Sequence, residues 1–586
     1  MRSPVDFHAR GAYGNRWGDK YEEKRGSQVL ATDALCSFPE APSGNASEWP
    51  GSPLGISNTI TRIKSRTTTH NKVVDATPGL LEKLLKSVRD HLNLIAGDAP
   101  IYQDDVVIHG IRVRATTDSA HLHDFWVENW YSPAEWQHFS GQAPPAEPRI
   151  KVYAMLGVGG EQEAAYYSRS TNTVIFFNTS YYGQLKSWVL GAVGRILAAE
   201  YGIHSIHGAC VEKSGKGVLY IAPTGTGKST SSYGLMEYPQ TRFHSDDWVY
   251  VRYTYAARGG RRICVLTTEG TDGSKARGYQ VYGWIERHAS DTAARLTAMT
   301  LDDEPLTLML GDLDLAKPLE AYAYTSEKIF YLRTNLVENY PLAACQILES
   351  KEENVPDVSD AFVVHNAVTL ENVIGEFRNS QNGEFCRALA GTPEDALRRI
   401  CARLIAFDNA RAMLDMSKVL PAERVYTNPM EPVKLSAVIL LKRNPDDPAV
   451  LSHLPIDVFM ERLLIGETPD KKHETAYNAY RAVDDKAERA CIEGLEKHAL
   501  ESATSLYQLF TKTDGAPASL AEEFELFRVI YQATRCYDLN TTLEKDPAVK
   551  GKREAVKRTM SILARTLDEE PRDVHLTIEN YGTYIA

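Results

Sequence analysis

The chain has 586 residues, of which 43% are hydrophobic and 24% charged, and this ordinary globular composition excludes a largely disordered protein. Its 65 Lys+Arg against 77 Asp+Glu give a net charge of −12 without a domain-sized basic block, so nucleic acid is not expected as a partner. Scattered cysteines, no secretory signal and no apolar run of membrane-spanning length predict a cytoplasmic protein without membrane contact.

The first 203 residues predict an extension followed by an α/β region. Residues 1–58 are rich in Gly, Ser, Pro and charge, so we expect a flexible N-terminal extension. The leucine spacing in PGLLEKLLKSVRDHLNLI (78–95) predicts a helix, and DDVVIHGIRVRATTD (104–118) alternates like one half-buried strand. With further β-rich runs and a helix predicted over 183–202, these segments indicate an N-terminal α/β region at 59–203.

Short β-type runs dominate residues 208–335, among them GVLYIA, WVYVRYTY and YQVYGWIE. Many strands with few helices predict a mixed, largely antiparallel sheet, not a regular βαβ repeat. The fold class is therefore α/β, with a P-loop domain expected at 204–443. Beyond it, helical periodicity predicts a helical C-terminal region at 444–586.

The segment APTGTGKS (222–229) has the form of a phosphate-binding loop between an apolar strand and a helix-compatible run. Its glycines let backbone amides converge on phosphate oxygens, and a helix N-terminus adds positive partial charge. Lys228 is expected to neutralise the β- and γ-phosphates, and Ser229 to offer a hydroxyl to Mg²⁺. The expected nucleotide-binding residues are Thr224, Gly225, Thr226, Gly227, Lys228, Ser229 and Thr230.

Two adjacent carboxylates, Asp246 and Asp247, begin the next β-type run, eighteen and nineteen residues after Lys228. On a strand, neighbouring side chains point to opposite faces. One carboxylate could then hold Mg²⁺ or its waters while the other accepts a proton from a substrate hydroxyl. Without the loop, a solvated strand start would be the simpler interpretation; the loop favours a functional pair.

Residues 205–251, with SIHGACVEKSGKGVLYIAPTGTGKST and SDDWVYV, resemble the bacterial HPr kinase/phosphorylase family. That family shares its P-loop fold with phosphoenolpyruvate carboxykinase. Its pattern is Ser-Ile-His-Gly, a short β-hairpin, the Gly-x-Gly-Lys-Ser loop and an Asp-Asp strand. His207 precedes Lys228 by twenty-one residues, in agreement with that pattern. The resemblance implies an ATP- and Mg²⁺-dependent kinase with this type of fold.

The resemblance also implies roles for individual residues. His207 and Lys228 would contact the transferring phosphoryl group. Ser229 and Asp246 would hold Mg²⁺. Asp247 would take the proton from the hydroxyl of the acceptor.

Two further roles and an assembly follow from the same resemblance. Glu269, in TTEGTDGSKARG, would be an additional acid linked to Mg²⁺. The arginine that stabilises transferred charge would be Arg333, in YLRTNLVENYP, or Arg277 in the loop of Glu269. The relatives also suggest a homo-oligomer.

Three functions stay open from the sequence. The leading one is a kinase that uses ATP and Mg²⁺ to phosphorylate a hydroxyl, on a protein serine or a small-molecule alcohol. The second is a carboxykinase-like decarboxylation, since PTGTGKST is close to that family's loop, although its second metal site is not identifiable here and Ser-Ile-His-Gly favours the kinase. The third is a nucleotide-binding regulatory or scaffold protein, against which intact Lys228, Asp246 and Asp247 argue.

Overall fold

The computed structural model describes residues 56–57, 68–69, 71–179, 182–222, 226–236, 238–277, 280–328, 330–333, 358–379, 392–406, 411–414, 420–464, 494, 497–498, 501–502 and 518–586. Contacts divide the chain into two compact units. One combines Met1–Arg62 with Tyr331–Val419, and the other combines Ile63–Phe330 with Leu420–Ala586. The expected extension at 1–58 lies outside the described residues, apart from Ile56–Ser57.

The first unit contains a small sheet and a group of helices. The three strands have the order β1-β19-β18, with bounds Ile56–Ser57, Arg411–Leu414 and Phe330–Arg333. The helices are α12 (Asp360–His365), α13 (Ala367–Asn379) and α15 (Glu394–Ala406). Leu370 of α13 and Cys401 of α15 are buried where these two helices pack together.

The second unit begins with a six-stranded sheet of order β2-β6-β7-β5-β4-β3. The strands are β2 (Thr68–Thr69), β3 (Tyr102–Ile108), β4 (Ile111–Thr117), β5 (Ile150–Met155), β6 (Ala164–Ser168) and β7 (Thr173–Phe177). Its helices are α3 (Asn71–Ala76), α4 (Leu80–Ile95), α5 (Ala120–Asn129), α6 (Pro133–Ser140) and α7 (Tyr182–Tyr201).

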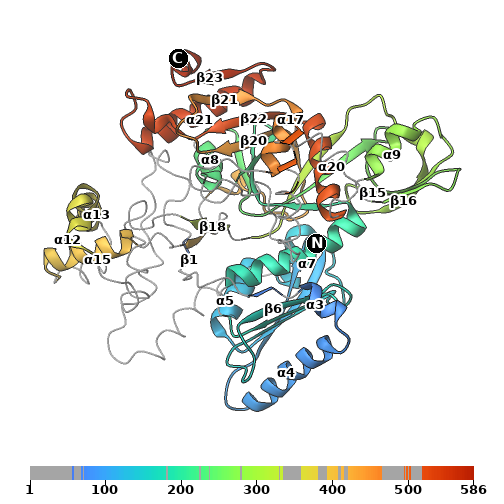
Figure 1. Ribbon diagram of the computed structural model, residues 1–586, viewed down its shortest axis with the longest axis horizontal. Coiled ribbons are helices and arrows are strands. Elements are labelled where there is room, and N and C mark those ends of the chain that lie inside the picture. The colour runs from blue at the N-terminus through green and yellow to red at the C-terminus, as the bar shows by residue number, and fades with distance from the viewer. Residues whose placement is uncertain are drawn as a thin grey trace, which may run out of the picture. The chain divides into compact units, whose positions relative to one another are not determined.

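Two helices cover the two faces of this sheet (Figure 1). Leu84 and Val88 of α4 pack against Ile175 and Phe177, while Phe176 points the other way and contacts Trp188 of α7. Alternate residues of β7 therefore fill two apolar layers, as the period of two in a strand requires.

The segment predicted as one strand over 104–118 is instead a hairpin. β3 and β4 pair from Tyr102 to Thr117 around a turn in which His109 has φ 44° and Gly110 φ 76°. Two consecutive positive φ values make the tight turn that matches the twist of a hairpin, and Gly110 adopts such a value without a steric cost.

The run YQVYGWIE, predicted as a strand, is instead part of a helix. This helix, α9 (Gln280–His288), buries Val281, Tyr282, Trp284 and Ile285, which share one helical face.

The larger sheet has 14 strands, and its main path is β11-β9-β10-β20-β17-β12-β13-β15-β16. β8 also pairs with β12, β14 with β13, β22 with β20 and β21, and β23 with β21. Strands β10, β20 and β22 are mutually parallel, and their other neighbours are antiparallel. The molecule is thus mixed α/β, with open sheets that combine parallel and antiparallel strands.

The first strands of this sheet come from one continuous segment. They are β8 (His204–Ile206), β9 (Gly208–Lys213), β10 (Lys216–Ile221), β11 (Thr241–Ser245), β12 (Val249–Ala256), β13 (Arg262–Glu269), β14 (Lys275–Arg277), β15 (Arg295–Thr300), β16 (Pro305–Met309) and β17 (Glu320–Thr325). The later strands are β20 (Val433–Lys442), β21 (Ala449–His453), β22 (Arg535–Asn540) and β23 (His575–Thr577).

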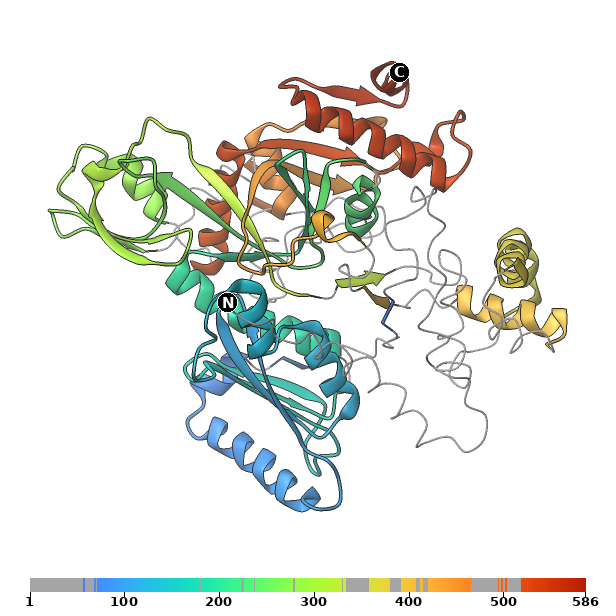
Figure 2. The ribbon, with the colours of Figure 1, turned by 180° about the vertical axis from the view of Figure 1, so that it is seen from behind.

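The region at 444–586 is not simply helical, because three of these strands belong to it. Its described helices are α17 (Ile456–Leu464), α20 (Ala518–Ala533), α21 (Lys552–Glu569) and α22 (Tyr581–Ile585). Figures 1 and 2 show α21 beside α8 (Lys228–Leu235), and Tyr238 after α8 lies within 2.9 Å, oxygen to oxygen, of Ser561. The C-terminal region therefore completes the larger sheet, and the boundary expected at 443 does not separate two units.

Close backbone packing at Gly208 yields a stability prediction. A Cβ there would lie 2.7 Å from the carbonyl oxygen of Tyr220, whereas one at Gly234 of α8 would meet the flexible end of Met560 at 2.8 Å. We expect Gly208→Ala to lower the free energy of unfolding by about 1–3 kcal/mol, because the backbone cannot yield as a methionine can. Gly234→Ala should cost less, since alanine favours a helix by about 1 kcal/mol over glycine. Urea unfolding of the full chain tests this order, and the reverse order would contradict it.

Candidate functional site

Strand pairing brings the motif residues to one edge of the larger sheet. Gly208 at the start of β9 pairs with Ile221 at the end of β10, so His207 and Ala222 are neighbours along that edge. Because β9 is also antiparallel to β11, the end of β11 reaches the same edge. Strand β12 starts there too, with Val249 pairing Ile206 of β8 and Thr325 of β17.

The phosphate loop leaves this edge between β10 and α8. Gly227 has φ 104°, a value that favours glycine, and α8 begins at Lys228. The ammonium of Lys228 donates a hydrogen bond to the carbonyl of Ala222 at 2.7 Å, and its side chain is buried. The expected strand before the loop and the expected helix after it are therefore both confirmed.

Parts of the loop are not described. Thr224 and Gly225 lie outside the described residues, Thr226 is buried, and Ser229 and Thr230 occupy the first turn of α8. The proposed contacts of these residues with a nucleotide stay predictions.

Asp246 and Asp247 lie in the turn between β11 and β12, not on a strand. Asp247 has φ 67°, and the amide of Trp248 donates to the carbonyl of Asp246 at 2.8 Å. A bond between residues two apart around a positive φ is a γ-turn of the rare, strained kind. The argument from opposite strand faces is therefore wrong, since the turn and not a pleat sets the direction of the two carboxylates.

Four side chains from separate elements form what we call the Asp247 cluster: Lys186 of α7, His207, Asp247 and Glu327. Oδ1 of Asp247 lies 3.2 Å from Nε2 of His207, and Oδ2 lies 3.2 Å from Nζ of Lys186. The same ammonium lies 2.8 Å from Oε2 of Glu327. One carboxylate is thus held from two sides, and one ammonium bridges two carboxylates.

Burial shapes the electrostatics of this cluster. The side chain of Glu327 is 0% exposed and that of Lys186 only 4%. Burial, together with the charge of Asp247, raises the pKa of Glu327 from 4.5 to about 8 despite the attraction of Lys186. Burial alone would lower the pKa of Lys186, but the carboxylates of Glu327 and Asp247 outweigh it and raise that pKa. Lys186 therefore stays cationic.

The raised pKa of Glu327 predicts a pH dependence of stability. A carboxyl that binds its proton more tightly when folded gives its full stabilisation below pH 4.5 and loses it as the pH rises to about 8. We expect wild type to lose on the order of a few kcal/mol of unfolding free energy across this window, and Glu327→Gln to lose less. Urea unfolding of both proteins at the two ends of the window measures the difference. Equal losses would contradict the assignment.

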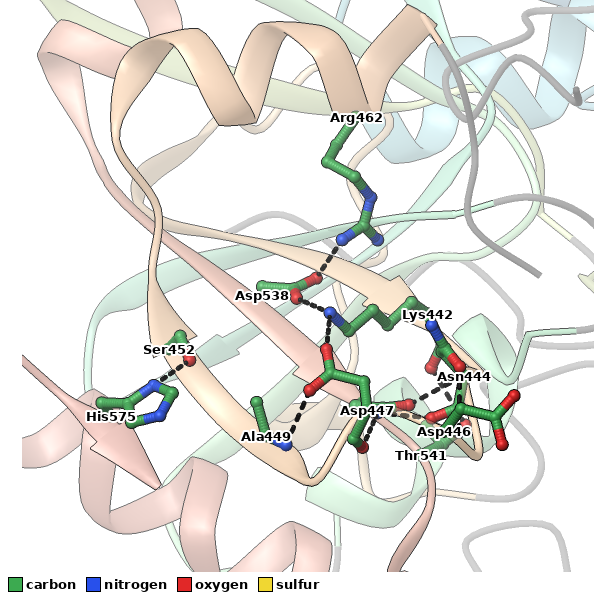
Figure 3. A network of polar contacts seen from close by, with 11 residues as sticks. Lys442, Asn444, Asp446, Asp447, Ala449, Ser452, Arg462, Asp538, Thr541 and His575 are labelled. Atoms are coloured by element: carbon green, nitrogen blue, oxygen red, sulfur yellow. Dashed lines mark hydrogen bonds and ion pairs between the residues drawn. The ribbon is translucent and has the colours of Figure 1, made fainter. Parts of the chain in front are cut away.

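A second polar network lies farther along the same sheet edge, after β20 and β22 (Figure 3). Nζ of Lys442 lies 2.5 Å from Asp447 and 2.7 Å from Asp538, and Asp538 also pairs with Arg462 of α17 at 2.9 Å. Lys442 is buried and engaged by two carboxylates, so this network ties strand ends together. A Cβ on Gly227 would lie 3.9 Å from Cγ2 of Thr541, which places the residue after β22 next to the phosphate loop.

The structure does not bring Glu269 or Arg277 into the Asp247 cluster. Glu269, at the end of β13, is exposed and pairs with Lys275 at 3.3 Å. Arg277 is exposed and donates to the carbonyl of Ala199 in α7. Ala199 is thirteen residues from Lys186, about 20 Å along a helix. Glu269 as a Mg²⁺ ligand stays a prediction; its ion-pair partner among the described residues is Lys275 of the neighbouring strand β14.

Arg333 ends β18 in the first compact unit, and its side chain lies outside what the structure describes. Its proposed role in stabilising transferred charge stays a prediction.

Binding of Mg²⁺ stays a prediction, with Asp246 and Ser229 as its expected protein ligands. Asp246 is 1% exposed at the sheet edge, and Ser229 lies in the first turn of α8. Among the described residues, no three His, Cys, Asp or Glu side chains are grouped closely enough to hold a metal by themselves. Mg²⁺ usually keeps several waters and uses one or two carboxylates with substrate phosphates, so a dedicated cage is not required.

Sequence reasoning missed Lys186 and Glu327. Lys186 offered a readable signal, because it precedes Val189, Leu190 and Val193 at helical spacing on a face that is buried. A lysine on an apolar face needs a partner. Glu327 gave no such signal, since only the pairing of β17 with β12 brings it to the cluster.

No described helix has the length and apolarity needed to cross a bilayer. In comparisons with known proteins, no family model and no curated protein matches this sequence, so its function has to be argued from the site.

Proposed function

We propose that this protein is an ATP- and Mg²⁺-dependent kinase that transfers the γ-phosphoryl group to a hydroxyl, with a P-loop domain of the HPr kinase type. One observation carries the proposal: Lys228, at the start of α8, and the His207–Asp247 pair lie at the same edge of one sheet. A phosphate held by Lys228 would lie near the carboxylate of Asp247, which could accept a proton.

The roles follow from charge and placement. Lys228 and the N-terminus of α8 would compensate the charge of the β- and γ-phosphates, and His207 would face the transferring group. Mg²⁺, held through Ser229 and Asp246, would neutralise charge on the phosphate oxygens. Glu269 has no part in this proposal.

In the transfer step, the acceptor oxygen forms a bond to the γ-phosphorus while the bond to the β-phosphate bridging oxygen breaks. The proton of the acceptor hydroxyl passes to Asp247. Lys186 and His207 both contact Asp247 and hold its carboxylate in place. A strong base is not required, since the transition state of phosphoryl transfer is loose and depends mainly on positioning and charge compensation.

A labelling experiment tests the proposed function. The full chain is incubated with radiolabelled ATP, Mg²⁺ and fractions that separate proteins from small alcohols, in parallel with a Lys228→Met variant. We expect one fraction to become labelled only by wild type, which also decides between a serine and a small-molecule acceptor. If ATP binds but no fraction is labelled, the nucleotide-binding regulatory alternative replaces the kinase.

A further inference from the structure

Lys186 contacts Asp247 from outside the P-loop domain expected at 204–443. It lies in α7, which belongs to the α/β region expected at 59–203, and its side chain is 4% exposed. Further contacts join this region to the larger sheet, among them the following two. Nζ of Lys328 lies 2.9 Å from Oε1 of Glu135, and the ring of His109, at the tip of the β3-β4 hairpin, lies 4.8 Å from that of Tyr324.

We propose that Lys186 and Glu327 are positioning residues for phosphoryl transfer. They would hold the Asp247 carboxylate toward the acceptor hydroxyl through the chain Glu327–Lys186–Asp247, whose first two members are buried. The proposal rests on the proposed function and extends it. The α/β region before residue 204 then completes the catalytic site and is more than a neighbouring substrate-recognition module.

Asp247 needs such support because its backbone is strained. A non-glycine residue at φ 67° persists only where its surroundings impose that conformation. His207 contacts one carboxylate oxygen and Lys186 the other, so the two contacts fix the plane of the group. A carboxylate that could rotate about its side-chain bonds would spend less time facing the hydroxyl.

Glu327 in turn fixes Lys186, and its own segment is tied to the same turn. The hydroxyl of Ser326 donates to the carbonyl of Trp248 at 3.0 Å, and the hydroxyl of Thr325 donates to the carbonyl of Glu327 at 3.0 Å. Glu327 also has no exposed surface. The ammonium of Lys186 is thus held between one fixed carboxylate and the one it positions.

The decisive variant is the double substitution Lys186→Met/Glu327→Gln. It removes the ammonium and the carboxyl group together at nearly constant volume, so that neither is left buried without the other. We expect a folded protein with unchanged ATP affinity and unchanged KM for ATP. Its kcat should be about 100-fold lower, because a misplaced Asp247 carboxylate slows phosphoryl transfer but does not affect nucleotide binding. In an Asp247→Asn background the double substitution should cause no further loss, since it acts through Asp247.

The matched control is Lys213→Met. Lys213 is another buried lysine paired with a carboxylate, that of Asp568, but it lies at the opposite end of β9 from His207. It should keep the wild-type rate. If the double variant does not fold, Glu327→Gln alone serves, with an expected kcat about 10-fold lower above pH 8, where Glu327 is ionised.

The possible outcomes separate the two proposals. A wild-type kcat in the folded variant, or a loss that adds fully to that of Asp247→Asn, overturns the positioning role while the kinase stands. A wild-type chain without any Lys228-dependent transfer overturns the kinase, and the positioning role with it.

Discussion

The Lys228→Met variant is expected to lose nucleotide binding and phosphoryl transfer together. Lys228 is the cation that begins α8, and its ammonium lies 2.7 Å from the oxygen of Ala222, at the start of the phosphate loop. Methionine keeps most of its length and removes its charge. We expect the Kd for ATP to rise at least about 10-fold and the transfer rate to fall about 1000-fold, a loss of the size seen when one charge-stabilising donor is removed.

Calorimetric titration with ATP and Mg²⁺, together with the transfer assay, measures both quantities. The fold should survive, because methionine fills nearly the same volume at this buried position. Glu269→Gln is a suitable control, since Glu269 lies on an exposed hairpin and should leave ATP affinity and Mg²⁺ dependence unchanged. A Lys228→Met protein that binds and transfers like wild type would refute the assignment of the phosphate loop.

Asp247→Asn should separate binding from chemistry. Asparagine has the size of aspartate but cannot take a proton from the acceptor hydroxyl. We expect the transfer rate to fall by about 100- to 10,000-fold, the usual contribution of a general base, with ATP affinity close to wild type. Transfer rate and ATP affinity are measured on the same preparation, so that misfolding would be detected as lost binding.

Asp246→Asn is the informative comparison for this variant. Asp246 is the adjacent residue in the same turn, with its side chain 1% exposed, and its proposed partner is Mg²⁺. Its loss should therefore be relieved in part by a higher Mg²⁺ concentration, whereas the loss in Asp247→Asn should not. If Asp247→Asn transfers at the wild-type rate, another group takes the proton and the proposed chemistry is wrong.

Local sequence patterns predicted the elements around the site but not always their shapes. The strand GVLYIA became β10, and the helix expected over 183–202 became α7 (Tyr182–Tyr201). The alternating pattern gave a wrong prediction where a tight turn interrupts the strand. In the run over 104–118, two positive φ values at His109 and Gly110 split one expected strand into two.

The C-terminal region shows why the pairing of strands far apart in the chain could not be predicted from the sequence. Strand β22 begins two residues after α20 ends, and its first three residues read as the end of a helical pattern. Only the parallel pairing with β20 makes Arg535–Asn540 a strand of the larger sheet. Parallel pairing joins segments far apart in the chain, so no local periodicity records it.

The sequence alone determined which residue types could handle a phosphate: a loop between strand and helix, a lysine, a histidine and two adjacent carboxylates. These follow from short-range rules, because a phosphate loop and its helix are contiguous in the chain. Only the tertiary structure decided which charges act on Asp247. It brought Lys186 and Glu327 to the His207–Asp247 pair, and it paired Glu269 with Lys275. The physical reason is that burial and ion pairing depend on which strand ends share a sheet edge, and that is settled by long-range pairing.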